Sequence, residues 1–262
     1  MNDDMKQLLD NLAARYNRKD FIEDDPVRFP HRYKSKTDVE ISAFVSAWIA
    51  YGQRAQIIKT LERLHAEYEG SPTEFIRKGK FMRYKDDKSS LYRFFKGEDY
   101  YSLCQRFHTI LFEENYPDLE SRIVAAELDS KKLKSNSTAM ESSFTAALNV
   151  LEKIIGLFPN QKGIPKDTSS ACKRLCLFLR WMTRNDGVVD LGFWHLLRPQ
   201  ELIIPLDTHV YRLSRELNLC ERNQADMKAA MEISLRLREY FSDDPIAGDF
   251  ALFGYGVSRQ PL

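Results

Sequence analysis

The sequence predicts an almost wholly helical protein. Its 11 glycines and 10 prolines fall mostly between stretches whose apolar residues recur at helical spacing. We find no stretch that alternates apolar and polar residues convincingly over the length of a strand. The chain also lacks internal repeats and low-complexity tracts, so helices joined by short loops are expected.

The helices of the first part follow from this spacing. Residues 5–16 predict a first helix, which ends at the polar, proline-bearing stretch 20–30. Asp38 is expected to cap the next helix, and another helix follows over 55–68. The helix after Asp38 has a strong apolar repeat, made by Ile41, Phe44, Val45, Trp48 and Ile49. These two helices should form a buried pair.

The middle of the chain is less regular. Pro72 opens a further helix, and the charged and aromatic region 80–99 has too little periodicity for a helix, which predicts a partly ordered connection. A solvated break is expected at 129–138. Helices are expected on both sides of this break, over 101–114, 119–128 and 142–158.

Length and charge restrict the classes of function. A chain of 262 residues can form one large domain or two lobes sharing a cleft. Because 39 Lys and Arg nearly cancel 38 Asp and Glu, a nucleic acid would have to bind a local patch. No apolar run approaches the roughly 18 residues of a membrane helix, and the first four residues are acidic where a signal peptide is basic. We expect a cytoplasmic protein without a membrane partner.

The four cysteines, at positions 104, 172, 176 and 220, are too few and too scattered for a disulfide framework. We expect reduced thiols. Cys172 and Cys176 stand four residues apart on one helical face, yet no His or third Cys lies nearby to complete a metal site. They are interpreted as small buried hydrophobes, and no metal is expected.

A predicted helix starting at Ser169 carries an unusual lysine. Its apolar stripe indicates a mostly buried helix, with Ala171, Leu175, Phe178 and Met182 widened by Cys172, Cys176 and Leu179. Lys173 lies in the first turn, where a cation meets the positive end of the helix dipole. A local rule broken beside a buried segment indicates function, and a neutral lysine amine is a nucleophile. The alternative is a surface lysine whose stem covers apolar neighbours.

An aspartate ends an apolar run and opens the following helix. Residues 203–206 resemble a strand in composition, and Asp207 precedes a helix with the inward face Val210, Leu213 and Leu217. One interpretation of Asp207 is a helix N-cap. A carboxylate fixed by amide donors between apolar residues is also a rigid, partly desolvated charge, so a catalytic role is compatible with the cap. His209 is interpreted as structural.

These residues resemble a known enzyme family. Segment 205–212, Pro-Leu-Asp-Thr-His-Val-Tyr-Arg, is similar to the aspartate motif of the helix-hairpin-helix DNA glycosylases. Lys173 followed by Phe-Leu-Arg at 178–180 resembles the lysine helix of the 8-oxoguanine branch. Residues 41–53 and 250–254 are similar to the early buried helix and the closing helix of that family. A bacterial family labelled as a domain of unknown function resembles the chain as well.

The resemblance implies two helical lobes with an atypical hairpin. A central bundle over 38–182 would end in the lysine helix, and a second lobe, from 1–37 and 186–262, would carry Asp207. Lys173 and Asp207 would be the catalytic pair. Lys173 would attack C1′ of a flipped, damaged nucleotide, while Asp207 would help to deprotonate Lys173 and stabilise positive charge on the sugar. The resulting imine permits strand cleavage by β-elimination.

Two departures from that family stand out. The usual Leu-Pro-Gly-x-Gly hairpin before the lysine is replaced by residues 163–170, so Ser169, Ser170 and the helix N-terminus are expected to bind a DNA phosphate instead. The insert 185–194 lengthens the spacing between the catalytic lysine and aspartate. A similarly long spacing occurs in an archaeal 8-oxoguanine branch, so the insert is compatible with catalysis.

Further DNA contacts are expected from the lysine helix and the insert. Lys173, Arg180 and Arg184 fall within one narrow sector of the helix, and this cationic sector should meet phosphates. Trp194 is expected to stack on the extruded base. Relatives with an iron–sulfur cluster hold it with four cysteines near the C-terminus, and none follows Cys220, so neither a cluster nor another cofactor is expected.

The principal hypothesis is a DNA base-excision glycosylase with β-lyase activity, acting on damaged bases such as oxidised purines in duplex DNA. The presence of both Lys173 and Asp207 favours this enzyme. A non-catalytic nucleic-acid-binding protein that keeps the fold is the alternative, favoured by the altered hairpin and the small net charge. A helical protein that acts on nucleotides or RNA is a third interpretation.

Overall fold

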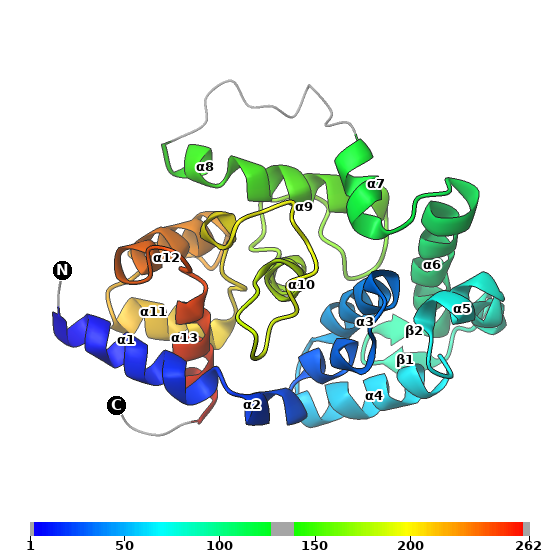
Figure 1. The fold of residues 1–262 in the computed structure, drawn as a ribbon, viewed down its shortest axis with the longest axis horizontal. Helices are drawn as coiled ribbons and strands as arrows, with labels where there is room; N and C mark the ends of the chain where they lie inside the picture. The colour runs from blue at the N-terminus through cyan, green and yellow to red at the C-terminus, as the bar shows by residue number, and fades with distance from the viewer. Residues whose placement is uncertain (1–2, 127–138, 259–262) are drawn as a thin grey trace. The chain divides into compact units, whose positions relative to one another are not determined.

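The structure is a computed structural model that describes residues 3–126 and 139–258. Within these ranges the chain is mostly α-helical, which confirms the predicted all-α class, and it contains two short strands (Figure 1). The predicted solvated break at 129–138 lies outside the described residues. None of the described helices is both long and apolar enough to cross a membrane.

The chain folds into two compact units, and each is described by itself. Unit 1 comprises Met1–Phe21, Leu128–Glu152 and Asp167–Leu262. Unit 2 comprises Ile22–Glu127 and Lys153–Lys166. These boundaries differ from those of the lobes expected from the sequence, because the whole lysine helix belongs to the same unit as the segment that carries Asp207. The predicted lobes stay a prediction, and units 1 and 2 are used below.

Unit 1 holds the helices from both ends of the chain. Its elements are α1 (Asp3–Tyr16), α8 (Ala139–Ser143), the first part of α9 (Thr145–Leu157), α10 (Lys173–Thr183), η6 (Pro199–Glu201), α11 (Thr208–Glu216), α12 (Met227–Tyr240) and α13 (Ala247–Ser258). Helix α13 packs against both α1 and α11. In Figure 1 the blue α1 runs beside the red α13.

The contact between α1 and α13 depends on a glycine. A Cβ added at Gly254 would lie 2.1 Å from Cγ of the Tyr16 ring, so glycine is needed for that ring to come this close to α13. Near the same end of α1, Phe21 packs edge-on to Phe250 with ring centroids 5.6 Å apart. The two ends of the described chain therefore share one apolar contact.

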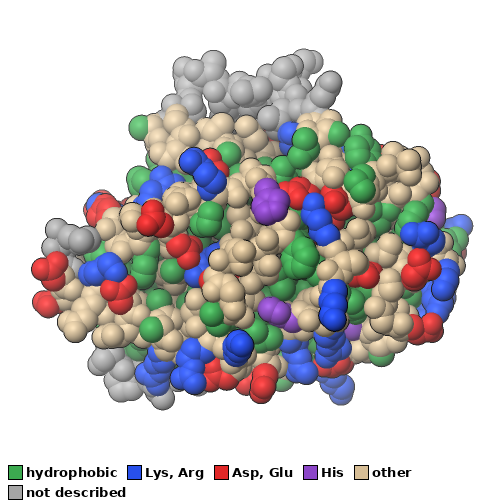
Figure 2. Space-filling model, viewed as in Figure 1, with side chains coloured by type: hydrophobic (Ala, Val, Ile, Leu, Met, Phe, Trp, Pro, Cys, Tyr) green, Lys and Arg blue, Asp and Glu red, His purple; other side chains and the backbone are tan. Residues whose placement is uncertain are grey.

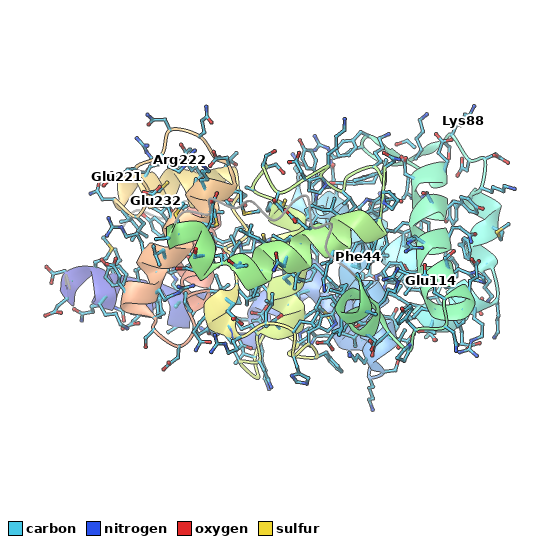
Figure 3. The ribbon with its side chains drawn as sticks, turned by 90° about the horizontal axis from the view of Figure 1, so that it is seen from above. Phe44, Lys88, Glu114, Glu221, Arg222 and Glu232 are labelled. Carbon is cyan, nitrogen blue, oxygen red and sulfur yellow. The ribbon has the colours of Figure 1, made fainter. Side chains whose placement is uncertain are left out.

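Unit 2 is built around α3. Its elements are the end of α2 (Lys19–Glu23), η1 (Pro26–Arg28), η2 (Pro30–Arg32), α3 (Lys36–Ile49), α4 (Arg54–Ala66), α5 (Pro72–Arg77), η3 (Lys80–Tyr84), β1 (Ser90–Tyr92), β2 (Phe95–Lys96), α6 (Gly97–His108), the π-helical turn η4 (Thr109–Glu113) and α7 (Leu119–Ala125). Helix α3 is buried along most of its length. Phe44 on α3, labelled in Figure 3, stacks on Phe158 with centroids 4.6 Å apart.

Two expectations for unit 2 are wrong. The N-cap of α3 is Ser35, not Asp38. Asp38 lies in the first turn of the helix and accepts hydrogen bonds from Ser71 Oγ (3.0 Å) and Thr73 N–H (2.8 Å) at the start of α5. The region 80–99 is not a loose connection, since it contains η3 and an antiparallel pair of strands. These strands are too short for an alternating pattern to be recognised in the sequence.

Candidate active site

Lys173 is the first residue of α10, so the helix begins four residues later than the sequence predicted. Two features delay it. Ser170 forms an isolated antiparallel bridge with Asp226, and Cys172 takes the left-handed backbone conformation with φ of 47°. Asp167 Oδ1 accepts the N–H of Ser169 (2.8 Å), which shapes the preceding turn. The chain thus enters α10 sharply, and Lys173 occupies the predicted first turn.

Asp207 is held by backbone groups on its own helix. The run Leu202–Leu206 before it is extended and buried, and Ile204 N–H donates to Ser234 Oγ of α12 (2.9 Å). Asp207 caps α11, because its Oδ1 accepts the N–H groups of His209 (2.9 Å) and Val210 (2.8 Å). The predicted N-cap is confirmed, and it fixes the direction of the carboxylate.

Lys173 and Asp207 lie together within unit 1. Lys173 Nζ is 3.3 Å from Asp207 Oδ2, the carboxylate oxygen that does not cap the helix. The lysine side chain is 36% exposed and the aspartate side chain 11% exposed. A substrate can therefore reach the amine, while the carboxylate is largely shielded from water. This arrangement suits an amine nucleophile with an adjacent proton acceptor.

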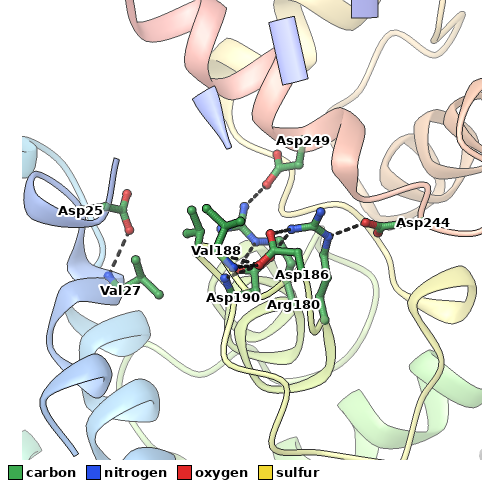
Figure 4. A network of polar contacts seen from close by, with 10 residues as sticks. Asp25, Val27, Arg180, Asp186, Val188, Asp190, Asp244 and Asp249 are labelled. Carbon is green, nitrogen blue, oxygen red and sulfur yellow. Dashed lines mark hydrogen bonds and ion pairs between the residues drawn. The ribbon is translucent and has the colours of Figure 1, made fainter. Parts of the chain in front are cut away.

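Arg180 does not belong to a solvent-facing cationic sector, and that expectation is wrong. Its side chain is 4% exposed. It forms an ion pair with Asp190 (Nε to Oδ1, 3.2 Å) and another with Asp249 on α13, as Figure 4 shows. Because two carboxylates occupy the guanidinium inside the protein, Arg180 is not available to a DNA phosphate in this structure.

Arg184 is buried in the same way, so the expectation that it contacts a DNA phosphate is wrong as well. Its guanidinium pairs with Asp190 (2.8 Å), with Asp244 (2.7 Å) and with Asp186. Asp186 in turn accepts backbone N–H groups at the start of the insert, from Val188 (2.8 Å) among others. Acidic residues of the insert and of the segment leading into α13 therefore cover the side of α10 that the sequence left open.

Burial changes the protonation of this network. Burial raises the pKa of Asp249 to about 6, although Arg180 opposes the shift, and the negative charges of Asp207 and Asp190 add to it. Burial also raises the pKa of Asp190 against the opposing effect of Arg180 and Arg184. Asp249 is thus a carboxyl that changes charge near neutral pH and that senses the charge of Asp207.

The remaining predicted DNA contacts have different environments. Ser169 and Ser170 are exposed, so a phosphate contact there stays a prediction. Trp194 is 2% exposed and packs edge-on to Phe178 with centroids 5.0 Å apart. Stacking on an extruded base, the role expected for Trp194, needs an exposed ring face. Because the Trp194 ring is buried in the core, it has no such face, and this expectation is wrong.

Sequence reasoning missed Asp249 and Asp190. Asp249 is the one acidic residue in the otherwise apolar sequence of α13, and such an isolated charge in a buried helix is a signal of a buried partner. The sequence around Asp190 gives no comparable indication of a buried ion pair, because Asp190 lies in an irregular insert close to the turn that contains Asp186. That both carboxylates pair with Arg180 becomes apparent only when the structure shows Arg180 to be buried.

A model of one protein family, described as Protein of unknown function (DUF2400), matches residues 25–258. The chain belongs to this family. The DUF2400 match includes Lys173, Asp207 and the carboxylates around Arg180. Searches of curated proteins and of solved structures gave no match.

Proposed function

We propose that this protein is a DNA base-excision glycosylase with β-lyase activity, and that Lys173 is its nucleophile. One observation carries the proposal: the lysine amine lies 3.3 Å from the free oxygen of a carboxylate whose other oxygen is anchored by two backbone N–H groups. The resemblance of both motifs to the helix-hairpin-helix glycosylases supplies the substrate class, a damaged base in duplex DNA.

The proposed chemistry uses the two oxygens of Asp207 differently. Oδ2 takes a proton from the ammonium of Lys173, and the neutral amine then attacks C1′ of the damaged nucleotide. The bond between C1′ and the base breaks. The base leaves with the bonding electron pair and takes the proton from Asp207, which is then ionised again. Held by its cap, the Asp207 carboxylate offsets the positive charge that develops on the sugar. The bond between C1′ and O4′ then breaks, O4′ takes a proton from the lysine nitrogen, and that nitrogen forms an imine with C1′. Loss of a proton from C2′ and of the 3′ phosphate by β-elimination then cuts the strand.

The test is reductive trapping. The protein is incubated with duplexes that carry an abasic site or one of a panel of damaged bases, and borohydride is added to reduce any imine to a stable adduct. Lys173→Gln should abolish the adduct. Lys228→Gln, which changes an exposed lysine of α12, is the matched control and should trap like the wild type. Trapping that persists in Lys173→Gln would assign the nucleophile to another residue.

A second candidate function is DNA binding without turnover. It is favoured by the ion pair itself, since a lysine neutralised by a neighbouring carboxylate also describes an ordinary surface contact. On the face shown in Figure 2, moreover, Lys and Arg side chains are interspersed with Asp and Glu. Binding of damaged duplex without any trapped adduct across the panel would support this candidate over the enzyme.

A further inference from the structure

We propose that Asp249, paired with Arg180, is a positioning residue of this site: it fixes α13 against α10, and its charge adds to the negative field that supports Asp207. The inference rests on the proposed function, because it assigns a role in that same reaction. It concerns a residue that contacts neither the lysine amine nor the sugar, so it acts through Asp207.

Helix α10 presents Lys173 and Arg180 on one side. Lys173 and Arg180 are seven residues apart, which is close to two helical turns, so their side chains point in similar directions. The first pairs with Asp207 at the start of α11 and the second with Asp249 on α13. Two ion pairs thus connect α10 to the helices that carry its carboxylate partners.

Helices α11 and α13 are themselves packed together. A Cβ added at Gly256 on α13 would lie 3.0 Å from Cβ of His209, in the first turn of α11. Asp249 stands two turns before Gly256 on the same helix. Asp249 therefore lies on α13, the helix that packs against the first turn of α11, which Asp207 caps. A shift of α13 would move Asp207 relative to Lys173.

The Arg180–Asp249 pair is rigid because it is buried. Both side chains are 4% exposed, and breaking one partner of such a pair leaves an uncompensated charge inside the protein. Cys176 lies between Lys173 and Arg180 on α10, and burial, with smaller contributions from Cys172 and Asp249, raises the pKa of its thiol. The charge of Asp249 is therefore felt one turn back along α10.

The network around Asp249 has an excess of negative charge. The guanidiniums of Arg180 and Arg184 are shared among four carboxylates, those of Asp186, Asp190, Asp244 and Asp249. Of the charges that bear on Asp249, α10 supplies Arg180, the insert supplies Asp190 and the cap of α11 supplies Asp207. At the two glycines where α13 is approached most closely, its neighbours are Tyr16 of α1 and Leu237 of α12, and neither carries a charge.

This charge depends on pH in a defined direction. Burial raises the pKa of Asp249 to about 6, so the residue is ionised above that pH and becomes neutral below it. A negative charge beside Asp207 favours positive charge on the reacting sugar. Imine formation should therefore slow as the pH falls through about 6, because the supporting charge is lost.

The kinetic test compares two asparagine variants by single-turnover trapping between pH 5 and pH 8. Asp249→Asn keeps an acceptor for Arg180 but removes the charge, so the rate at pH 8 should fall about tenfold and the acid limb near pH 6 should disappear. DNA affinity should stay within about twofold. Asp244→Asn, which changes a carboxylate of the same network on Arg184, is the control and should keep the acid limb. An acid limb that survives unchanged in Asp249→Asn would overturn the proposal.

A second measurement uses the protein without DNA. With ¹³C-labelled aspartate, the Asp249 carboxyl should titrate near pH 6 in the wild type, and Asp207→Asn should move that midpoint to lower pH because a like charge is removed. An unmoved midpoint would overturn the coupling even if Asp249→Asn fails to fold. If the wild type traps no substrate, the proposed function and the positioning role of Asp249 in that reaction fail together, whereas the titration still decides whether Asp249 and Asp207 are coupled.

Discussion

Asp207 offers Lys173 only one of its two carboxylate oxygens, since the other accepts the first N–H groups of α11. Oδ1 of Asp207 therefore has a structural role, the helix cap, and Oδ2 has the proposed chemical role. A substitution that keeps the cap and removes the charge can test the two roles separately.

Asp207→Asn should retain the cap and lose the chemistry. Asparagine caps a helix about as well as aspartate, whereas Asp207→Ala should lose about 1 kcal/mol of stability. The amide cannot accept the proton of Lys173, so base excision should fall by about 10² or more while damaged DNA is still bound. Thermal melting and single-turnover excision measure the two effects. Wild-type excision by Asp207→Asn would reduce Asp207 to a cap.

Arg184→Ala should destabilise the protein strongly, by about 3–5 kcal/mol, because it leaves buried carboxylates without their cation. The control is Arg212→Ala on α11, whose side chain is 64% exposed and whose ion pair with Glu216 is long, 3.7 Å. That variant should change the free energy of unfolding by less than about 0.5 kcal/mol. Urea unfolding measures the free energy of unfolding of both variants. Equal losses of stability would contradict the assignment of Arg184 to a buried ion-pair network.

Asp249 should impose a pH dependence on stability. Its pKa is raised in the folded protein relative to the unfolded chain, so the folded state holds the extra proton and this contribution to stability is lost as the pH rises from about 4 to about 6. Asp249→Asn has no such proton. The melting temperature of the variant minus that of the wild type should therefore be larger at pH 7.5 than at pH 4.5. A difference that is the same at both pH values would contradict the raised pKa.

Gly254→Ala should weaken the contact between α1 and α13. The added Cβ would overlap the Tyr16 ring, and overpacking of this kind costs about 1–3 kcal/mol. Gly156→Ala in α9 is the control, because nothing lies within 4 Å of its added Cβ and alanine is the better helix former. Chemical denaturation should show a loss for the first variant and no loss for the second. Equal stability of the two variants would mean that the Tyr16 ring can move away from the added Cβ without destabilising the protein, which would contradict the prediction.

Local sequence patterns predicted the features that depend on neighbours in the chain. The apolar run before Asp207 and the helix after it were sufficient to predict the cap, and periodicity placed α3 and α9. The start of α10 was missed because Cys172 adopts a left-handed conformation without the glycine that usually signals one. Such a conformation depends on the turn around it, which no local pattern records.

The cationic sector on α10 shows what helical spacing does not predict. Helical spacing correctly grouped Lys173, Arg180 and Arg184, yet it could not show what covers each of them. Two of the three are covered by carboxylates from the irregular insert that follows α10 and from α13, which is distant in sequence. Only Lys173, at the end of the helix, stays partly exposed. Periodicity describes a face of a helix, whereas tertiary packing decides whether that face meets water.

The packing of α1 on α13 also has a consequence for the order of folding during synthesis. Helix α1 leaves the ribosome long before the surface on which it rests, around Gly254 and Phe250. Unit 2 consists mostly of continuous chain and has its own core, so it can fold while translation continues. Unit 1 must wait for α13. Until then, α1 lacks its contact with α13, and this interval is when a chaperone would be most useful to the nascent chain.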